Sequence, residues 1–151
     1  MAVRVGINGF GRIGRLALRA LIESGRKDVK VVGINDLGSV EDNAHLLKYD
    51  SVHGTLGTDV KVSGDTIDVG TGPIKVTQER DPSKLPWGEL GVDIAYESTG
   101  IFASRDKAAA HLDAGAKKVL ISAPAADADM TIVYGVNHDQ LTSEHTIVSN
   151  A

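Results

Sequence analysis

The feature that most constrains the fold is a set of glycines between an apolar segment and an amphipathic one. Gly9, Gly11 and Gly14 form the pattern G-x-G-x-x-G. The preceding segment, 3–8 (VRVGIN), predicts a short strand, and another strand is expected at 29–35 (VKVVGIN). The helix predicted between them has an apolar face consisting of Ile13, Leu16, Ala17, Ala20 and Leu21. Together these segments predict one right-handed, parallel βαβ unit.

A strand, a glycine-rich turn and a helix in this order are typical of a dinucleotide-binding site. The first glycine allows the tight turn, the second lets a pyrophosphate approach the backbone, and the third lets the helix pack on the strand. Asp36 follows Gly14 by 22 residues and comes directly after the second strand, where a carboxylate accepts hydrogen bonds from ribose hydroxyls. The alternatives are a tight turn without a ligand and an Asp36 that only favours the next helix.

The rest of the chain continues the alternation of strands and helices. Ser39 is expected to cap a helix that runs to Lys48, and Ser104 to cap another that runs to Ala114. Further strands are expected at 92–96, 118–122, 131–136 and 145–149, and a loop at 81–88. The pattern therefore predicts a single α/β domain over 1–151, with a Rossmann-type, doubly wound, mostly parallel sheet and a β-hairpin or meander insertion around 56–77.

Small and polar residues follow four of the predicted strands. In an open α/β sheet, ligands bind at the carboxyl ends of the strands. Loop chemistry alone could explain each of these groups, but four of them at one edge favour a ligand site. The groups are Asn8-Gly9, Asp36, Ser98-Thr99-Gly100 and Ser122-Ala123-Pro124.

Composition narrows the class of protein. The formal net charge of −4 gives no indication of nucleic acid as a partner, and no apolar run reaches the 18 residues that a membrane span would need. The chain has no cysteine, and its five histidines lack metal-ligand spacing, so we expect no metal site. The N-terminal segment MAVRVGINGF has no long apolar stretch of the kind found in secretion signals, so we expect a cytoplasmic location. Arg12, Arg15 and Arg19 could suggest a phosphate or partner surface, although a solvated helix stripe is the favoured interpretation.

Several motifs together carry a resemblance to a known family. They are VGINGFGRIGR, INDLG, HLLKYDSVHG, LPWGELGVD, ESTGIF, GAKKVLISAPA, YGVNHD and IVSNA. The whole chain resembles phosphorylating glyceraldehyde-3-phosphate dehydrogenases of the bacterial type. The resemblance implies NAD as cofactor and oxidation of glyceraldehyde 3-phosphate, with inorganic phosphate as the second substrate, to 1,3-bisphosphoglycerate. It also implies a homotetramer for the full-length enzyme.

The resemblance also implies roles for individual residues. Arg12 and Ile13 match residues that meet the pyrophosphate and the nicotinamide, and Asp36 matches the ribose ligand. Phe102 lies where an aromatic ring could flank the adenine. The cofactor-binding residues expected in this way are Gly9, Phe10, Gly11, Arg12, Ile13, Gly14, Asp36, Arg80, Ser98, Thr99, Gly100 and Ser122.

Parts of the family's catalytic apparatus have no counterpart in the sequence. The nucleophilic cysteine belongs just after SNA (149–151), and the base histidine and phosphate-binding residues belong to a second, catalytic domain. A C-terminal helix that packs on the NAD-binding domain in the family is also missing. We therefore expect an NAD-binding domain truncated before the catalytic domain and inactive alone. Two alternatives remain: a fragment of the sister enzyme erythrose-4-phosphate dehydrogenase, against which Asp36 and SAPA (122–125) argue, and a stand-alone dinucleotide-binding module.

Overall fold

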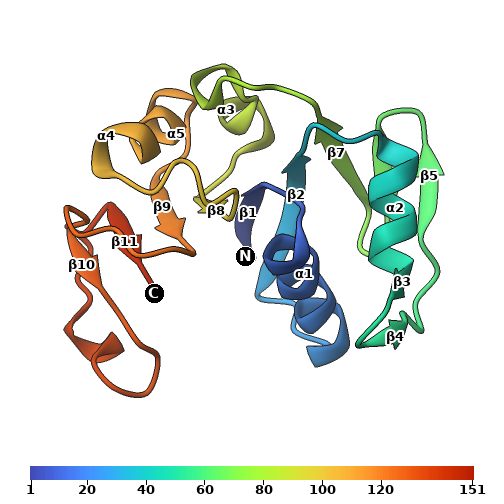
Figure 1. The fold of residues 1–151 in the computed structure, drawn as a ribbon, viewed down its shortest axis with the longest axis horizontal. Coiled ribbons are helices and arrows are strands. Elements are labelled where there is room, and N and C mark those ends of the chain that lie inside the picture. The colour runs from blue at the N-terminus through green and yellow to red at the C-terminus, as the bar shows by residue number, and fades with distance from the viewer.

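The structure is a computed structural model that describes residues 1–151, and its centre is a nine-stranded sheet (Figure 1). The strands are β1 (Val3–Asn8), β2 (Val29–Asn35), β3 (Tyr49–Asp50), β4 (Gly54–Thr55), β5 (Lys61–Ser63), β6 (Thr66–Asp68), β7 (Pro73–Thr77), β8 (Ile94–Glu97), β9 (Lys118–Ile121), β10 (Met130–Thr131) and β11 (Ile147–Ser149). The helices are α1 (Arg12–Ser24), α2 (Val40–Lys48), α3 (Trp87–Leu90), α4 (Arg105–Ala108) and α5 (Ala110–Asp113), with 3₁₀ turns η1 (Pro82–Lys84) and η2 (His138–Gln140).

The order of the strands confirms the predicted fold class. Along the sheet it is β10-β11-β9-β8-β1-β2-β7-β6-β5, while β3 and β4 pair separately. All neighbours from β10 to β7 are parallel, and only the β5-β6-β7 meander is antiparallel. Read as β7-β2-β1-β8-β9-β11, the parallel part has the Rossmann order 3-2-1-4-5-6. The strand order reverses between β1 and β8, so this is where a ligand crevice is expected.

Helices cover both faces of the sheet. On one face, α1 and α2 contribute Leu18 and Leu47 to a core with Ile7 and Ile34. On the other face, Trp87 of α3 lies fully buried against the backbone of β1 and β2. A Cβ atom at either Gly6 or Gly33 would come within 3 Å of the Trp87 ring, so glycine is required at both strand positions. This doubly wound arrangement leaves the carboxyl ends of the central strands between two helical layers.

The α1 helix forms where expected, but it buries a different face from the predicted one. Gly14, Leu18 and Arg19 are buried, whereas Ile13 is 54% exposed. Gly14 turns toward β1 because only a glycine can come so close to it. Arg19 follows the buried Leu18, and both of its Nη atoms donate to the carbonyl of Gly54 at 3.0 and 3.1 Å. A hydrophobicity pattern treats glycine and arginine as surface residues, so it predicted the wrong buried face for α1. The interpretation of Arg19 as part of a solvated stripe is wrong.

The strand expected at 131–136 is largely absent. Only Met130–Thr131 pairs, with β11, and the chain then turns so that Val133, Tyr134 and Val136 are exposed. β-branched residues form a strand only where a neighbouring strand can pair with them. The loop expected at 81–88 likewise contains η1 and the start of α3.

Other local predictions agree with the structure. Ser39 caps α2 by accepting a hydrogen bond from the backbone N–H of Asp42 at 3.0 Å. Ser104 caps the helix that follows, although this helix is divided into α4 and α5 at Ala109. None of the helices combines the length and the hydrophobicity that crossing a lipid bilayer requires.

Candidate functional site

An open cleft of about 380 Å³ lies at the carboxyl ends of the central strands, at the reversal of strand order. It brings together six of the predicted site residues and the more loosely assigned Phe102. The lining consists of Asn8, Gly9, Gly11, Asn35, Asp36, Leu37, Glu79, Arg80, Ser98, Thr99, Ile101 and Phe102. The turn after β1, the ends of β2 and β7, and the loop after β8 therefore meet around one space.

The three glycines occupy three different environments, and each fits the role predicted for it. Gly9 has a φ of +90°, which allows the tight turn. A Cβ atom at Gly14 would lie 2.2 Å from the carbonyl oxygen of Gly9, so this glycine permits close packing of α1 on β1. A Cβ atom at Gly11 would meet nothing within 4 Å. Gly11 thus leaves open space in front of the N-terminus of α1, where no side chain caps the helix.

The carboxylate of Asp36 ties the glycine-rich turn to the end of β2. One oxygen accepts a hydrogen bond from the backbone N–H of Phe10 at 3.0 Å, and the other accepts one from the N–H of Gly38 at 2.9 Å. Asp36 lines the cleft, and each of its carboxylate oxygens has capacity for a further hydrogen bond. This arrangement holds the carboxylate in a fixed orientation, and it can accept hydrogen bonds from vicinal hydroxyls of a ligand.

The structure places four predicted residues of this turn outside the cleft lining: Gly14, which packs against Gly9, and Phe10, Arg12 and Ile13. Phe10 is 1% exposed and packs in the core, so only its backbone is available near the site. The Ile13 side chain is exposed at the start of α1. Arg12 pairs with Asp50, the Nη1–Oδ1 distance being 2.9 Å. The backbone N–H of His53 and the Arg12 guanidinium hold the pKa of the Asp50 carboxyl well below its usual range.

The remaining lining comes from the loop after β8, on one side of β1, and from Arg80, which follows β7 on the other side. The hydroxyl of Ser98 donates to the carbonyl oxygen of Gly9 at 2.7 Å, which joins this loop to the glycine-rich turn. Arg80 is exposed and takes part in none of the ion pairs of the chain, so its charge is available to a ligand. Gly100 and Ser122 lie at the same sheet edge but do not line the cleft.

A row of polar side chains lies beneath the cleft, and only Asn8 of this row was predicted to lie at the ligand-binding edge of the sheet. Thr77, Asn35, Asn8 and Glu97 are in register on β7, β2, β1 and β8. The Asn35 amide donates to Asn8 Oδ1 at 2.8 Å, and the Asn8 amide donates to Glu97 Oε2 at 2.7 Å. The Thr77 hydroxyl donates to Asn35 Oδ1 at 2.7 Å. The available signal was that both strands of the βαβ unit end in asparagine.

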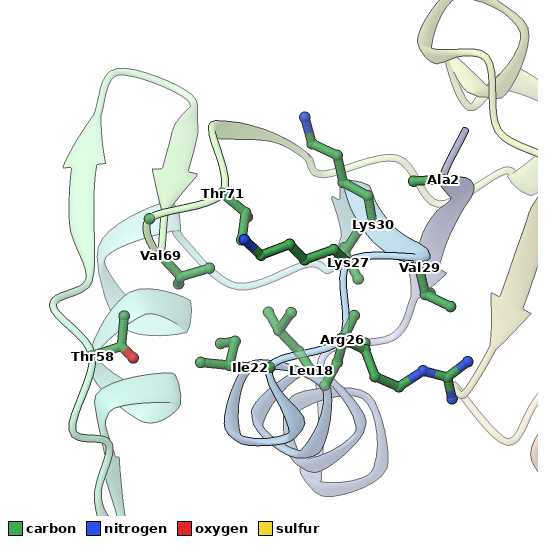
Figure 2. Close-up of a pocket in the computed structure, with 14 residues that line it drawn as sticks. Ala2, Leu18, Ile22, Arg26, Lys27, Val29, Lys30, Thr58, Val69 and Thr71 are labelled. Carbon is green, nitrogen blue, oxygen red and sulfur yellow. The ribbon is translucent and has the colours of Figure 1, made fainter.

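The largest cavity of the chain, about 460 Å³, lies elsewhere, beside α1 on the side facing β6 and β7. Figure 2 shows the apolar side chains of Leu18, Ile22 and Val69 around it, with Lys27 extending across it toward Thr71. A second apolar groove of about 350 Å³ continues along α1 to Tyr96. Neither lies at the carboxyl ends of the strands, so the cleft above the polar row is the better candidate for a nucleotide site.

Comparisons with known proteins agree with this geometry. Residues 3–105 match the family model described as "Glyceraldehyde 3-phosphate dehydrogenase, NAD binding domain". The chain is 71% identical over 151 residues to a glyceraldehyde-3-phosphate dehydrogenase of Xanthobacter flavus and 63% identical to one of Cereibacter sphaeroides. In both comparisons all of this chain and 45% of the relative are covered. The chain therefore spans about half the length of the curated relatives that it matches.

Proposed function

Because the chain belongs to the family of glyceraldehyde 3-phosphate dehydrogenase NAD-binding domains, we propose that the cleft between β1, β2 and β8 is its NAD site. NAD is the cofactor of this family of domains. In the proposed site, the pyrophosphate lies over Gly11 at the N-terminus of α1, where unpaired backbone N–H groups and the helix dipole stabilise negative charge. Asp36 accepts hydrogen bonds from the adenosine ribose, and Arg80 lies at the rim.

The observation that carries this proposal is the difference between the three glycines. Two of them have no room for a side chain because protein atoms lie next to them, whereas Gly11 faces open space. A glycine with free space beside it is not required for packing, since its φ of −75° is accessible to any residue. Because Gly11 also lines the cleft at the carboxyl ends of the strands, the space beside it is best explained as room for a ligand. Calorimetric titration with NAD tests the proposal, and the absence of binding would refute it.

The charge of Asp36 predicts a preference for NAD over NADP. The 2′-phosphate of NADP would lie against the Asp36 carboxylate, and two like charges about 4 Å apart cost roughly 4 kcal/mol at an effective dielectric of 20. Even a third of this cost corresponds to about a tenfold difference in affinity. Leu37, which follows Asp36 in the lining, has no hydroxyl to bind a phosphate. We expect calorimetry to give at least about tenfold tighter binding of NAD.

The matched variant for this prediction is Asp36→Asn, which removes the charge and keeps the shape. The preference for NAD should narrow in this variant because the electrostatic penalty on NADP is removed. Thermal unfolding of both proteins serves as the control, since the amide group must still accommodate the N–H groups of Phe10 and Gly38. Equal affinities of the wild type for the two cofactors would show that Asp36 does not have the assigned role.

We further propose that the full-length protein is an oxidoreductase of the phosphorylating type, with a phosphorylated aldehyde and inorganic phosphate as substrates. In this proposal residues 1–151 are the NAD-binding domain, and a catalytic domain supplies the nucleophile. The high identity to relatives named glyceraldehyde-3-phosphate dehydrogenase supports it, as does the presence of Asp36 at the ribose position. The family resemblance also supports a homotetramer, which light scattering on the full-length protein would test.

A further inference from the structure

A buried polar chain runs under the cleft on the face of the sheet covered by α3 and α5. Trp87 and His111 have no exposed surface, and Glu97 is 1% exposed. The indole Nε1–H of Trp87 donates to His111 Nδ1 at 3.0 Å. On the other side of the ring, His111 Nε2 lies 2.5 Å from Glu97 Oε2. These two hydrogen bonds thus connect Trp87, the only tryptophan of the sequence, to Glu97, the last residue of β8.

The Trp87 contact determines which nitrogen of His111 carries a proton. An indole N–H can only donate, so His111 Nδ1 must accept and carries no hydrogen. A neutral imidazole has one N–H group, which is therefore on Nε2 and donates to Glu97. An imidazolium would direct a second N–H at the indole N–H, so His111 is neutral in this arrangement. The contact between His111 and Glu97 is a hydrogen bond rather than an ion pair.

Glu97 is surrounded by donors and is consequently a carboxylate. Its Oε2 accepts from His111 Nε2 and from the Asn8 amide, and its Oε1 accepts from both the backbone N–H and the hydroxyl of Thr99. Three of these four donors are N–H groups, which cannot accept a hydrogen bond, so only the carboxylate satisfies all four donors as they are arranged. None of the cationic side chains pairs with Glu97. Hydrogen bonds from four donor groups alone stabilise this buried charge.

Two of the residues that donate hydrogen bonds to Glu97 line the cleft, namely Asn8 and Thr99. Thr99 belongs to the loop after β8, and Asn8 precedes the glycine-rich turn. The Thr99 hydroxyl donates its hydrogen to Glu97, and the oxygen of the same hydroxyl accepts a hydrogen bond from the N–H of Ile101 at 3.3 Å. The contact with Glu97 therefore also restricts the position of Ile101, further along the loop. Through Asn8 the same carboxylate reaches Asn35 at the end of β2.

We propose that Glu97 is a positioning residue of the cleft, a buried carboxylate that fixes the loop after β8 and the turn after β1 in the shape that receives the dinucleotide. The inference rests on the proposed NAD site. Glu97 itself does not line the cleft, so it acts through Thr99 and Asn8. The role requires a carboxylate, because the single oxygen of a neutral amide cannot accept from donors on both sides.

The first test is calorimetric titration of Glu97→Gln with NAD. The variant should bind NAD at least about tenfold more weakly than the wild type, a change of about 1.4 kcal/mol. The matched control is Glu89→Gln, the same change at an exposed position of α3, which should bind as the wild type does. Wild-type affinity in a folded Glu97→Gln protein would overturn the inference. If the wild type itself binds no NAD, the proposed function fails, which is a different result.

A second pair of variants tests the positioning role even if Glu97→Gln does not fold. Thr99→Val keeps the shape of the side chain and removes the hydroxyl, whereas Thr99→Ser keeps the hydroxyl. The valine variant should weaken NAD binding about three- to tenfold, as expected for the loss of one hydrogen bond, and the serine variant should restore it. Equal affinities of the two variants would overturn the inference.

The tautomer of His111 provides a spectroscopic readout of the hydrogen bonds that this ring makes with Trp87 and Glu97. The ¹⁵N chemical shifts of the imidazole ring should show a protonated Nε2 and an unprotonated Nδ1. An imidazolium spectrum in the wild type at neutral pH would contradict the assignment of Glu97 as a carboxylate held by neutral donors.

Discussion

Gly11→Val is expected to abolish detectable NAD binding while leaving the fold intact. The valine side chain would project into the open space beside Gly11, which the pyrophosphate occupies in the proposed complex. Its backbone can keep the φ of −75° of Gly11, and replacing a glycine by an apolar residue at a helix N-cap lowers the free energy of unfolding by about 1 kcal/mol. Calorimetry with NAD measures the first effect, and urea unfolding followed by circular dichroism measures the second.

Gly57→Val is the matched control for this experiment. A Cβ atom at Gly57 would likewise meet nothing within 4 Å, and the φ of Gly57 is not positive, but this glycine lies outside the cleft. The Gly57→Val variant should bind NAD as the wild type does. A folded Gly11→Val protein with wild-type affinity for NAD would show that the pyrophosphate does not lie over Gly11, and the proposed orientation of the cofactor would have to be abandoned.

The isolated 151-residue chain is expected to turn over no glyceraldehyde 3-phosphate. In the proposed reaction, oxidation to an acyl phosphate would proceed through a thiohemiacetal and a thioester, each formed on an activated thiolate. The chain has no cysteine. Ser149 cannot replace it, because its side chain is buried and its hydroxyl donates to the carbonyl of Ala123 at 2.8 Å. An assay that follows NADH formation by absorbance should give the rate of the blank.

Two comparisons make the activity measurement decisive. The full-length protein, assayed in parallel, should be active, and its cysteine-to-serine variant should behave like the 151-residue chain. The same chain should still bind NAD, although more weakly than the full-length protein, because the cleft around Gly11 and Asp36 is built from its own residues. Turnover by the isolated chain, after removal of host enzyme, would disprove the need for a thiol.

The geometry of the glycine-rich turn could be predicted from the sequence because its signals are local. A glycine fingerprint records close approaches of the backbone, and the three environments of Gly9, Gly11 and Gly14 agree with it. The capping role of Ser39 also depends only on residues a few positions away. For the same reason the fold class followed from the order of strand and helix segments.

The parts that the sequence did not predict depend on distant neighbours. Glu97 and His111 are charged or polar by type, and only their mutual contacts make burial possible. Arg19 is buried because the carbonyl of Gly54, far along the chain, accepts from its guanidinium. The exposed segment after Thr131 has strand-like composition but no further strand to pair with. The periodicity of apolar residues reports the tendency of one segment to form a helix or a strand. It contains no information about which distant residues that segment will contact.

The central position of β1 also bears on how the chain is assembled during synthesis. One side of β1 pairs with β2, its neighbour in the sequence, but the other side pairs with β8, and the contact between Asn8 and Glu97 joins residues 89 positions apart. At roughly 5–20 residues per second, about 4–18 s pass between the synthesis of these residues. Until β8 emerges, one hydrogen-bonding edge of β1 has no partner. The nucleotide cleft therefore cannot form until β8, which is synthesised late, pairs with β1, the first strand to be synthesised.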